Sequence, residues 1–368
     1  MQSTLSVLRM HTPRKLLVFR SGLLGDTLVG LPALWMLRRS FPTAHVTYLW
    51  QNTGVYGHVA PPDVLTGSGV VDDFRELSLR GTSVDRWRNY VRLWFELRRS
   101  KFDTALVLEA NHWSRRPELF LRSAGIPVVV GPGKRMPKVY RNRDGRLPRV
   151  AHIADELLTI VSRLGIREPR AGTGDMSLPR TGEERRKVDA WLARNHVPGD
   201  ALLVAIGPGS NMPAKRWPID RFQRVVASLV NRFDVVPVIL GAASDRELGL
   251  DLVKGCGRGI VAAGELGIRE GVELLSRCVL FLGNDTGTMH MAVSAGTPVV
   301  AVFAATDMPG RWDPYGPGNK AFRLTVDCEG CLLRECVVEG MRCLLGISID
   351  DVSAACRDVV ARRLSGAA

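Results

Sequence analysis

Short runs of apolar, often β-branched residues alternate with longer helical patterns along the whole chain. In the first half the apolar runs stand at 16–19, 45–49, 104–108 and 127–130, and the helical patterns at 30–39, 86–99 and 153–164. A short apolar run between turn residues predicts a buried strand, and apolar residues spaced by three and four predict a helix. Because strands that alternate with helices form parallel sheets, this half predicts an α/β domain.

A segment rich in glycine and proline, 165–184, separates this pattern from a second copy and favours a linker. Beyond it, strands are predicted at 201–206, 235–240, 260–262, 279–282 and 299–303, and helices at 219–233, 245–254, 269–277 and 288–295. We therefore predict an N-terminal domain at 1–165, a linker at 166–185 and a C-terminal domain at 186–368. Ligands of doubly wound parallel sheets bind beyond the carboxyl ends of the strands, so the active site is expected between the two halves.

The composition fits two globular domains. The 368 residues are 45% hydrophobic and 24% charged, which excludes a disordered chain and a small disulfide scaffold. No apolar stretch reaches the roughly 18 residues of a membrane span. Residues 1–15 lack the apolar core and cleavage site of a secretory signal. We expect a soluble, cytoplasmic protein.

The chain carries a formal net charge of +13, which attracts polyanions. Nucleic acid, anionic lipids and phosphorylated glycans all qualify, but no nucleic-acid-binding motif is present, so we expect no nucleic-acid partner. Residues 86–101 place Trp87 and Trp94 among several arginines. Such a helix can lie on an anionic membrane, or it can pack on its own sheet and leave a solvated basic edge.

Four of the seven cysteines are clustered with the spacing C-x2-C-x4-C-x6-C. They are Cys328, Cys331, Cys336 and Cys343. Four thiolates can surround one structural zinc or iron ion, while two disulfides or free thiols remain alternatives.

A glycine loop follows the first predicted strand. Gly22 and Gly25 permit close backbone approach to a ligand, and Asp26 stands where a helix begins. Asp26 can cap that helix or act as a general base in the cleft.

A second loop, 207–218, follows a strand of the second half. In it, Ser210 and Asn211 can donate hydrogen bonds to a phosphate, and Lys215 can supply a positive charge. The alternative is a surface connection with solvated cations.

A third motif, 283–290, joins a strand to a helix and contains Asp285, Thr286, Gly287, Thr288 and His290. The free N–H groups of a helix N-terminus suit a diphosphate. His290 can face the ligand or pack against the sheet.

Three of these motifs occur in order, and with them the sequence resembles glycosyltransferase family 9, the heptosyltransferases of the lipopolysaccharide core. The matching segments are 22–26 (Gly-Leu-Leu-Gly-Asp) with 31–34, 215–218 (Lys-Arg-Trp-Pro), and 285–290 (Asp-Thr-Gly-Thr-Met-His) with 296–298. The resemblance implies a GT-B fold of two Rossmann-like domains, with the acceptor on the first and the nucleotide sugar on the second. The cysteine spacing also resembles the Cys-rich segment of many members.

The resemblance also implies residue roles. Asp26 becomes the base that deprotonates the acceptor hydroxyl, and Lys215 the cation that neutralises the leaving diphosphate. Together with Gly25, the donor-binding residues become Ser210, Asn211, Asp285, Thr286, Gly287, Thr288 and His290. In Rossmann-like domains a carboxylate after a strand commonly accepts hydrogen bonds from the ribose hydroxyls of the nucleotide. Asp245 is the first candidate for this role, and Glu247 is the second.

The leading hypothesis is an inverting heptosyltransferase that uses ADP-heptose and needs no cofactor for catalysis. Its acceptor would be an anionic glycan or glycolipid, and the enzyme would be peripheral at the inner membrane. The alternatives are another nucleotide sugar or a glycan outside lipopolysaccharide, a GT-B nucleotide-sugar epimerase, and a non-catalytic anion-binding protein.

Overall fold

The computed structural model describes residues 12–54, 59–109, 115–132, 140–337 and 340–366. The chain divides into two compact units. The first comprises Met1–Lys138 and Ile153–Pro179, and the second Val139–His152 and Arg180–Ala368. Residues 1–11, on which the expectation about a secretory signal mostly depends, lie outside the described residues.

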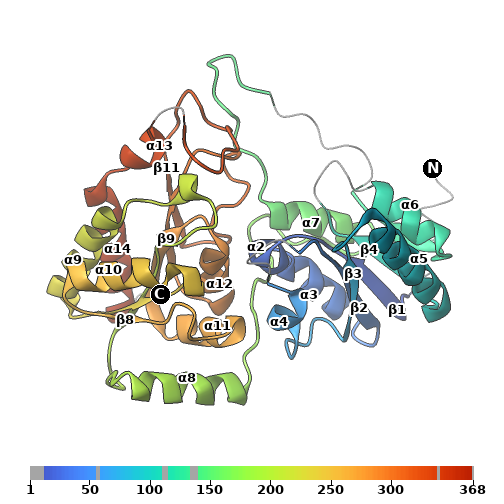
Figure 1. Cartoon of the computed structure of the whole chain (residues 1–368), viewed down its shortest axis with the longest axis horizontal. Helices are drawn as coiled ribbons and strands as arrows, with labels where there is room; N and C mark the ends of the chain where they lie inside the picture. The colour runs from blue at the N-terminus through green and yellow to red at the C-terminus, as the bar shows by residue number, and fades with distance from the viewer. Residues whose placement is uncertain (1–11, 55–58, 110–114, 133–139, 338–339, 367–368) are drawn as a thin grey trace. The chain divides into compact units, whose positions relative to one another are not determined.

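The first unit is built on a parallel sheet of five strands in the order β3-β2-β1-β4-β5 (Figure 1). The strands are β1 (Lys15–Phe19), β2 (His45–Asn52), β3 (Asp73–Ser78), β4 (Thr104–Val107) and β5 (Val128–Val130). The helices are α2 (Leu24–Leu28), α3 (Leu31–Ser40), α4 (Pro61–Leu65), α5 (Ser83–Ser100), α6 (Arg115–Ser123) and α7 (Ile153–Ser162). The strand order reverses between β1 and β4. In parallel sheets of this kind, a crevice forms at the carboxyl ends of the two strands where the order reverses.

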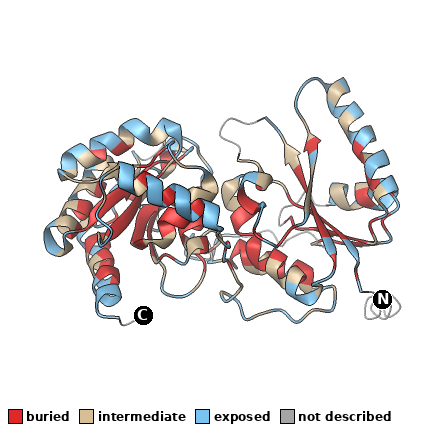
Figure 2. Ribbon diagram, turned by 90° about the horizontal axis from the view of Figure 1, so that it is seen from below, coloured by how far each residue is buried: buried red, intermediate tan, exposed pale blue. Residues whose placement is uncertain are grey.

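The apolar strand residues explain the layers of this unit. Leu17 of β1 and Leu49 of β2 pack against Leu93 and Leu97 of α5 in one buried cluster. The central strands β1, β2 and β4 are largely buried, whereas the helices keep an exposed face (Figure 2). Near-continuous apolar strands of this kind are typical of parallel sheets covered on both faces.

The second unit repeats this plan with six parallel strands in the order β11-β10-β9-β6-β7-β8. The strands are β6 (Leu203–Gly207), β7 (Val236–Ile239), β8 (Ile260–Val261), β9 (Cys278–Asn284), β10 (Val299–Phe303) and β11 (Lys320–Arg323). The α-helices are α8 (Gly182–Arg194), α9 (Ile219–Phe233), α10 (Arg246–Cys256), α11 (Ile268–Ser276), α12 (Gly287–Ala295), α13 (Arg342–Leu345) and α14 (Ile349–Leu364), and the short 3-10 turns are η1 (Pro213–Lys215) and η2 (Ala243–Asp245). Here the strand order reverses between β6 and β9.

The prediction of two doubly wound parallel-sheet domains is confirmed. The pattern missed the strands β3 and β11 and the helices α4, α6, α8, α13 and α14. The division of the chain also differs from the predicted boundaries, because residues 140–152 pack with the second unit and residues up to Pro179 with the first. Among the described residues, no helix is long and apolar enough to cross a membrane.

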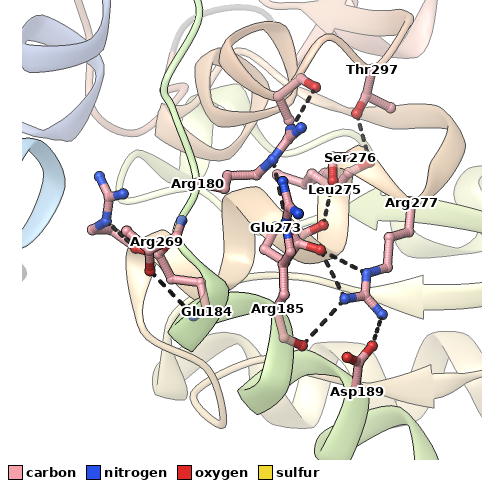
Figure 3. Close-up of polar contacts among 12 residues, drawn as sticks. Arg180, Glu184, Arg185, Asp189, Arg269, Glu273, Leu275, Ser276, Arg277 and Thr297 are labelled. Atoms are coloured by element: carbon pink, nitrogen blue, oxygen red, sulfur yellow. Dashed lines mark hydrogen bonds and ion pairs between the residues drawn. The ribbon is translucent and has the colours of Figure 1, made fainter. Parts of the chain in front are cut away.

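The predicted linker at 166–185 contains the start of α8, which is attached to α11 by charged side chains (Figure 3). Glu273 of α11 accepts from Arg277 and pairs with Arg180 at 3.3 Å, and Arg277 also reaches Asp189 of α8. These contacts fix residues 180–194 to the second unit.

Candidate active site

In the first unit, Asp26 lies at the start of α2 and contacts the glycine loop before it. Its Oδ2 accepts a hydrogen bond from the backbone N–H of Leu23, the N-cap residue, at 2.8 Å. Asp26 is thus the acidic half of a capping box rather than the N-cap itself. One third of its side chain stays exposed (33%), so the carboxylate can also meet a ligand.

The glycine at position 22 is required by this carboxylate. Gly22 has a φ of +128°, which side chains rarely adopt, and a Cβ there would lie 2.5 Å from Asp26 Oδ2. The carboxylate of Asp26 therefore rests against the bare backbone of the loop, which explains the glycine four residues before Asp26.

Two buried charges hold this loop, and sequence reasoning missed both. Ser21 donates from its N–H and its Oγ to the same oxygen of Glu109, at 2.6 and 2.7 Å. Arg20 donates to the carbonyl oxygens of Asp26 and Leu108, both at 2.6 Å. Burial raises the pKa of Glu109, while the charge of Arg20 and the hydrogen bonds from Ser21 oppose this rise. A charge directly after the apolar run 104–108 was the available signal.

In the second unit, Lys215 and Asp285 meet although 70 residues separate them. Lys215 Nζ lies 2.6 Å from Asp285 Oδ2, and their side chains are only 16% and 9% exposed. Burial raises the pKa of Asp285, and the positive charge of Lys215 opposes that rise. The structure thus brings together two of the sequence-predicted site residues.

Asn284, which the motif contains but the predicted site omitted, joins the loops on either side. Its Nδ2 donates to the carbonyl of Pro208 at 2.8 Å, and its Oδ1 accepts from the N–H of Trp217 at 3.0 Å. The side chain is fully buried. Asn284 therefore fixes both ends of the loop that carries Lys215.

The N-terminus of α12 begins beside this ion pair. Thr286 is its N-cap residue, but no side chain caps the helix; the Thr286 and Thr288 hydroxyls instead bond each other at 2.8 Å. A helix start without a side-chain cap leaves N–H donors and partial positive charge for an anion. Thr286, Gly287 and Thr288 are partly exposed.

His290, inside α12, is buried and faces Trp312 edge-on, with ring centroids 6.2 Å apart. Burial lowers its pKa to about 3, with further contributions from the charges of His152 and Lys215. Nδ1 has no partner among the described residues. The imidazole is therefore neutral at physiological pH, and one nitrogen remains available.

The remaining predicted donor residues lie on neighbouring loops. Asp245 accepts from the N–H of Ala242 at 2.9 Å, and its carboxylate occupies the space a Cβ on Gly209 would need. Ser210 is buried and accepts from Met212, whereas Asn211 is exposed. Gly25 lies in α2 of the first unit beside Asp26.

The four clustered cysteines do not fit a metal centre in this arrangement. Across the described residues, no three His, Cys, Asp or Glu side chains stand close enough to hold one ion. All seven cysteines are described, and none forms a disulfide. Cys336 Sγ accepts from the N–H of Met341 at 3.2 Å, and Cys343 packs against the apolar core.

Helix α5 combines both sequence interpretations. Leu93 and Leu97 pack on the sheet, as expected of a structural helix. Val84, Trp87 and Phe95 form a second apolar stripe and are 57%, 66% and 49% exposed. The structure places exposed arginines beside this stripe at positions 88, 92 and 99.

Comparison with known proteins gives one family. The model of glycosyltransferase family 9 (heptosyltransferase) matches residues 90–342. Lipopolysaccharide heptosyltransferase 3 of Escherichia coli K12 is 25% identical over 299 residues, which cover 79% of this chain and 82% of that protein.

Two solved structures share the fold along nearly the whole chain. A family 9 glycosyltransferase of Veillonella parvula superposes with a TM-score of 0.71 at 23% identity, covering 95% of this chain and 97% of that one. The ADP-heptose lipopolysaccharide heptosyltransferase II of E. coli does so with a TM-score of 0.68 at 19% identity, covering 95% and 99%. These similarities confirm the GT-B architecture that the sequence resemblance implied.

Proposed function

Because this chain belongs to glycosyltransferase family 9 (heptosyltransferase), we propose that it transfers heptose from ADP-heptose to a lipopolysaccharide core or related glycolipid, with inversion. The observation that carries the proposal is the pairing of Lys215 with Asp285 beside the uncapped start of α12. A buried cation and a helix N-terminus are the two features that a departing diphosphate needs.

The donor is assigned to the second unit. The α12 N-terminus and Lys215 bind the diphosphate, and Ser210 and Asn211 add hydrogen bonds from the loop after β6. Asp245 receives the ribose hydroxyls, since it lies against the backbone of that same loop at Gly209. A neutral His290 accepts or donates one hydrogen bond without adding charge.

Asp26 of the first unit is assigned as the base. The acceptor hydroxyl gives its proton to the Asp26 carboxylate, and its oxygen forms a bond to the anomeric carbon of heptose. The bond from that carbon to the diphosphate breaks, and ADP leaves with the electron pair. Lys215 and the α12 dipole stabilise the charge that grows on ADP, so the transfer needs no cofactor.

We propose an anionic lipid surface as a further partner of this protein, because the proposed acceptor is a glycolipid. The support is the net charge of +13 together with the exposed apolar and basic stripes of α5. We place the protein in the cytoplasm, peripheral at the inner membrane.

The proposal is tested by incubating the full chain with ADP-heptose and a delipidated core oligosaccharide, with EDTA present. We expect release of ADP and an acceptor heavier by one heptose, with inverted anomeric configuration. Transfer only from a different nucleotide sugar would show that the donor is not ADP-heptose. Conversion of the nucleotide sugar in the absence of acceptor would indicate an epimerase. Binding of ADP without product in any of these assays would indicate a non-catalytic, anion-binding protein.

A further inference from the structure

A cavity of about 490 Å³ opens on the second unit between α9, α14 and the segment 345–348 that leads into α14. Its volume lies within the range of about 300–1,000 Å³ that is usual for small-molecule sites. Of the described residues that line it, none is assigned above to the donor or to the base. The proposed transfer therefore leaves this cavity without a function.

The helices α9 and α14, which bound the cavity, lie side by side on the sheet of the second unit (Figure 1). Val225 and Leu229 of α9 belong to the same buried apolar cluster as Val352 and Cys356 of α14. Each helix therefore turns an apolar side to this core and keeps a polar side for the cavity.

Polar residues at helical spacing line the cavity from both helices. Arg221, Arg224 and Ser228 share one face of α9, and Ser353 and Arg357 share one face of α14. Ser228 Oγ lies 2.7 Å from Ser353 Oγ, so the two polar faces meet directly. Arg224 and Arg357 therefore each stand one helical turn from a shared pair of hydroxyl groups.

Two of the three guanidinium groups are held by neutral oxygen atoms. Arg221 Nη1 donates to the carbonyl oxygen of Ile347 at 2.9 Å, and Arg357 Nη1 donates to Ser353 Oγ at 3.0 Å. Each of these bonds uses one of the five N–H groups that an arginine carries. Within the described part of the chain the Arg224 side chain has no hydrogen bond or ion pair. Most of the N–H donors in the cavity are thus left for a ligand.

These arginines also lack carboxylate partners. Arg269 and Arg277, partly buried arginines of the same unit, both pair with carboxylates, whereas the partly buried Arg221 and Arg357 form no ion pair among the described residues. One acid, Asp350, lines the cavity, but it is exposed and has no ion pair in that part of the chain either. Three arginines against one carboxylate leave two positive charges that an anion would neutralise.

Phosphate fits these donors better than a carboxylate does. A guanidinium group presents parallel N–H groups in a fixed plane that match two oxygens of one anion, and such charge-assisted pairs are strong. A carboxylate has two oxygens in one plane, whereas a phosphate monoester has three terminal oxygens. Arginines on two different helices can therefore share one phosphate.

From these observations we propose that the cavity lined by Arg221, Arg224 and Arg357 binds the phosphate group of a phosphate monoester, at a site separate from the donor diphosphate. The inference goes beyond the proposed function and stands whether or not the chain transfers heptose. The phosphate belongs either to a soluble molecule or to a lipid head group, because both carry the same dianion.

Direct binding tests the site without relying on turnover. The probe is glycerol 3-phosphate, titrated calorimetrically into the full chain with enough ADP present to fill the donor site. We expect Arg224→Gln and Arg357→Gln each to weaken binding about tenfold, as loss of a hydrogen bond to a charged group would. Arg224→Lys, which keeps the charge but loses the planar fork, should weaken binding less. Because no other described side chain depends on Arg224, its variants should fold even if Arg357→Gln does not, and melting temperatures check this.

Matched controls are Arg232→Gln on α9 and Arg362→Gln on α14. They remove the same charge from exposed positions of the same two helices, outside the cavity, and should bind the probe like wild type. Equal losses in the control and cavity variants would show that only the net charge attracts the probe, and this would overturn the proposal. Unaltered affinity in every cavity variant that folds would also overturn it.

A second experiment identifies the source of the phosphate. Phosphatidylcholine vesicles with and without phosphatidic acid present the same monoester on a lipid, and sedimentation measures binding. Binding of glycerol 3-phosphate that the cavity variants weaken supports a soluble ligand. Binding only to the phosphatidic acid vesicles, weakened in the cavity variants and kept in the controls, supports a lipid head group. If wild type binds neither probe, the proposal is wrong.

Discussion

Asp26 combines a structural contact with the proposed chemical role, and one substitution separates them. Asparagine keeps an oxygen that can accept from Leu23, so Asp26→Asn should fold and bind ADP like wild type. It cannot take a proton, and loss of a general base typically lowers turnover about 10²- to 10⁴-fold. Steady-state rates, melting temperature and ADP titration on this variant check the assignment. Near-normal turnover would refute it.

Asp26→Ala is the matched comparison, because alanine removes both the base and the acceptor of the Leu23 N–H hydrogen bond. We expect the same fall in turnover, together with a loss of about 1 kcal/mol in stability.

Lys215 and Asp285 form an ion pair, so replacing either residue alone changes the stability of the fold as well as any binding of ADP. Lys215→Ala leaves a buried, uncompensated carboxylate, and breaking such a pair costs about 3–5 kcal/mol. Lys215→Ala combined with Asp285→Asn should recover most of this stability. If Lys215 binds the diphosphate, ADP affinity stays low in the double variant. Thermal unfolding and ADP titration distinguish the two effects, and wild-type affinity in the double variant would exclude Lys215 from the site.

The depressed pKa of His290 predicts a loss of stability in acid. Its pKa is about 3 in the folded chain, against 6.5 as the ordinary value, so the unfolded chain takes up the proton first. The stabilising effect of the neutral ring is complete above about pH 6.5 and is lost as pH falls toward 3, by up to about 1.4 kcal/mol per pH unit. The free energy of unfolding, measured with urea at several pH values from 7 to 4, should fall more steeply for wild type than for His290→Gln. Parallel curves would contradict this.

The sequence predicted Asp26, Lys215 and Asp285 as site residues, because each follows a strongly apolar strand at a loop rich in turn residues. It missed Glu109 and Asn284 for a physical reason. Their partners lie on other strands, and strand order is decided by packing that no local pattern records. Proximity of Glu109 to Ser21 follows only once β1 and β4 are known to be neighbours.

At the level of elements, α8 shows why polar helices are hard to predict. Its buried side is narrow and includes Val188 and Trp191, and most of the other residues of the helix are charged. Its position comes from ion pairs with α11, including Arg269 with Glu184. Burial alone would raise the pKa of Glu184, but hydrogen bonds from Arg269 and Thr181 lower it. Edge strands β3 and β11 escaped prediction similarly, because both are only partly buried.

This cluster predicts a measurable contribution from Glu273. The side chain is buried and pairs with Arg180 and Arg277, so Glu273→Gln should lower the free energy of unfolding by about 1–3 kcal/mol. Asp189→Asn, whose carboxylate is exposed, should cost at most about 1 kcal/mol. Chemical unfolding followed by circular dichroism compares the two. A larger effect at Asp189 would mean that α8 is held by its surface pairs.

At the scale of the whole molecule, the architecture was predictable while the boundaries were not. Alternating strands and helices at a regular spacing dictate two parallel sheets, and strongly periodic elements such as β10 and α9 were placed to the residue. Residues 140–152 join the second unit through contacts such as the N–H of Val150 donating to Pro309 and His152 bonding to Asp313. Those contacts span about 160 residues of sequence and leave no trace in local composition.

The net charge of +13 and the surface of α5 together predict binding to anionic membranes. Exposed Trp87 and Phe95 can enter the lipid interface, while Arg88 and Arg92 contribute about 1 kcal/mol each through attraction to anionic head groups. Replacing both arginines by serine should therefore weaken binding to vesicles containing anionic lipid roughly 30-fold, and Trp87→Ser should weaken it independently.

Leu250→Ser, at an exposed apolar position of α10, is the matched control and should bind like wild type. Binding should also fall as salt rises, because the Debye length shrinks to about 10 Å at 0.1 M. Vesicle sedimentation at low and high salt measures all four proteins. Equal binding to neutral and anionic vesicles at low salt would show that charge does not bring this enzyme to the lipid surface. Unchanged binding in the α5 variants would show that a different face of the protein contacts the lipid.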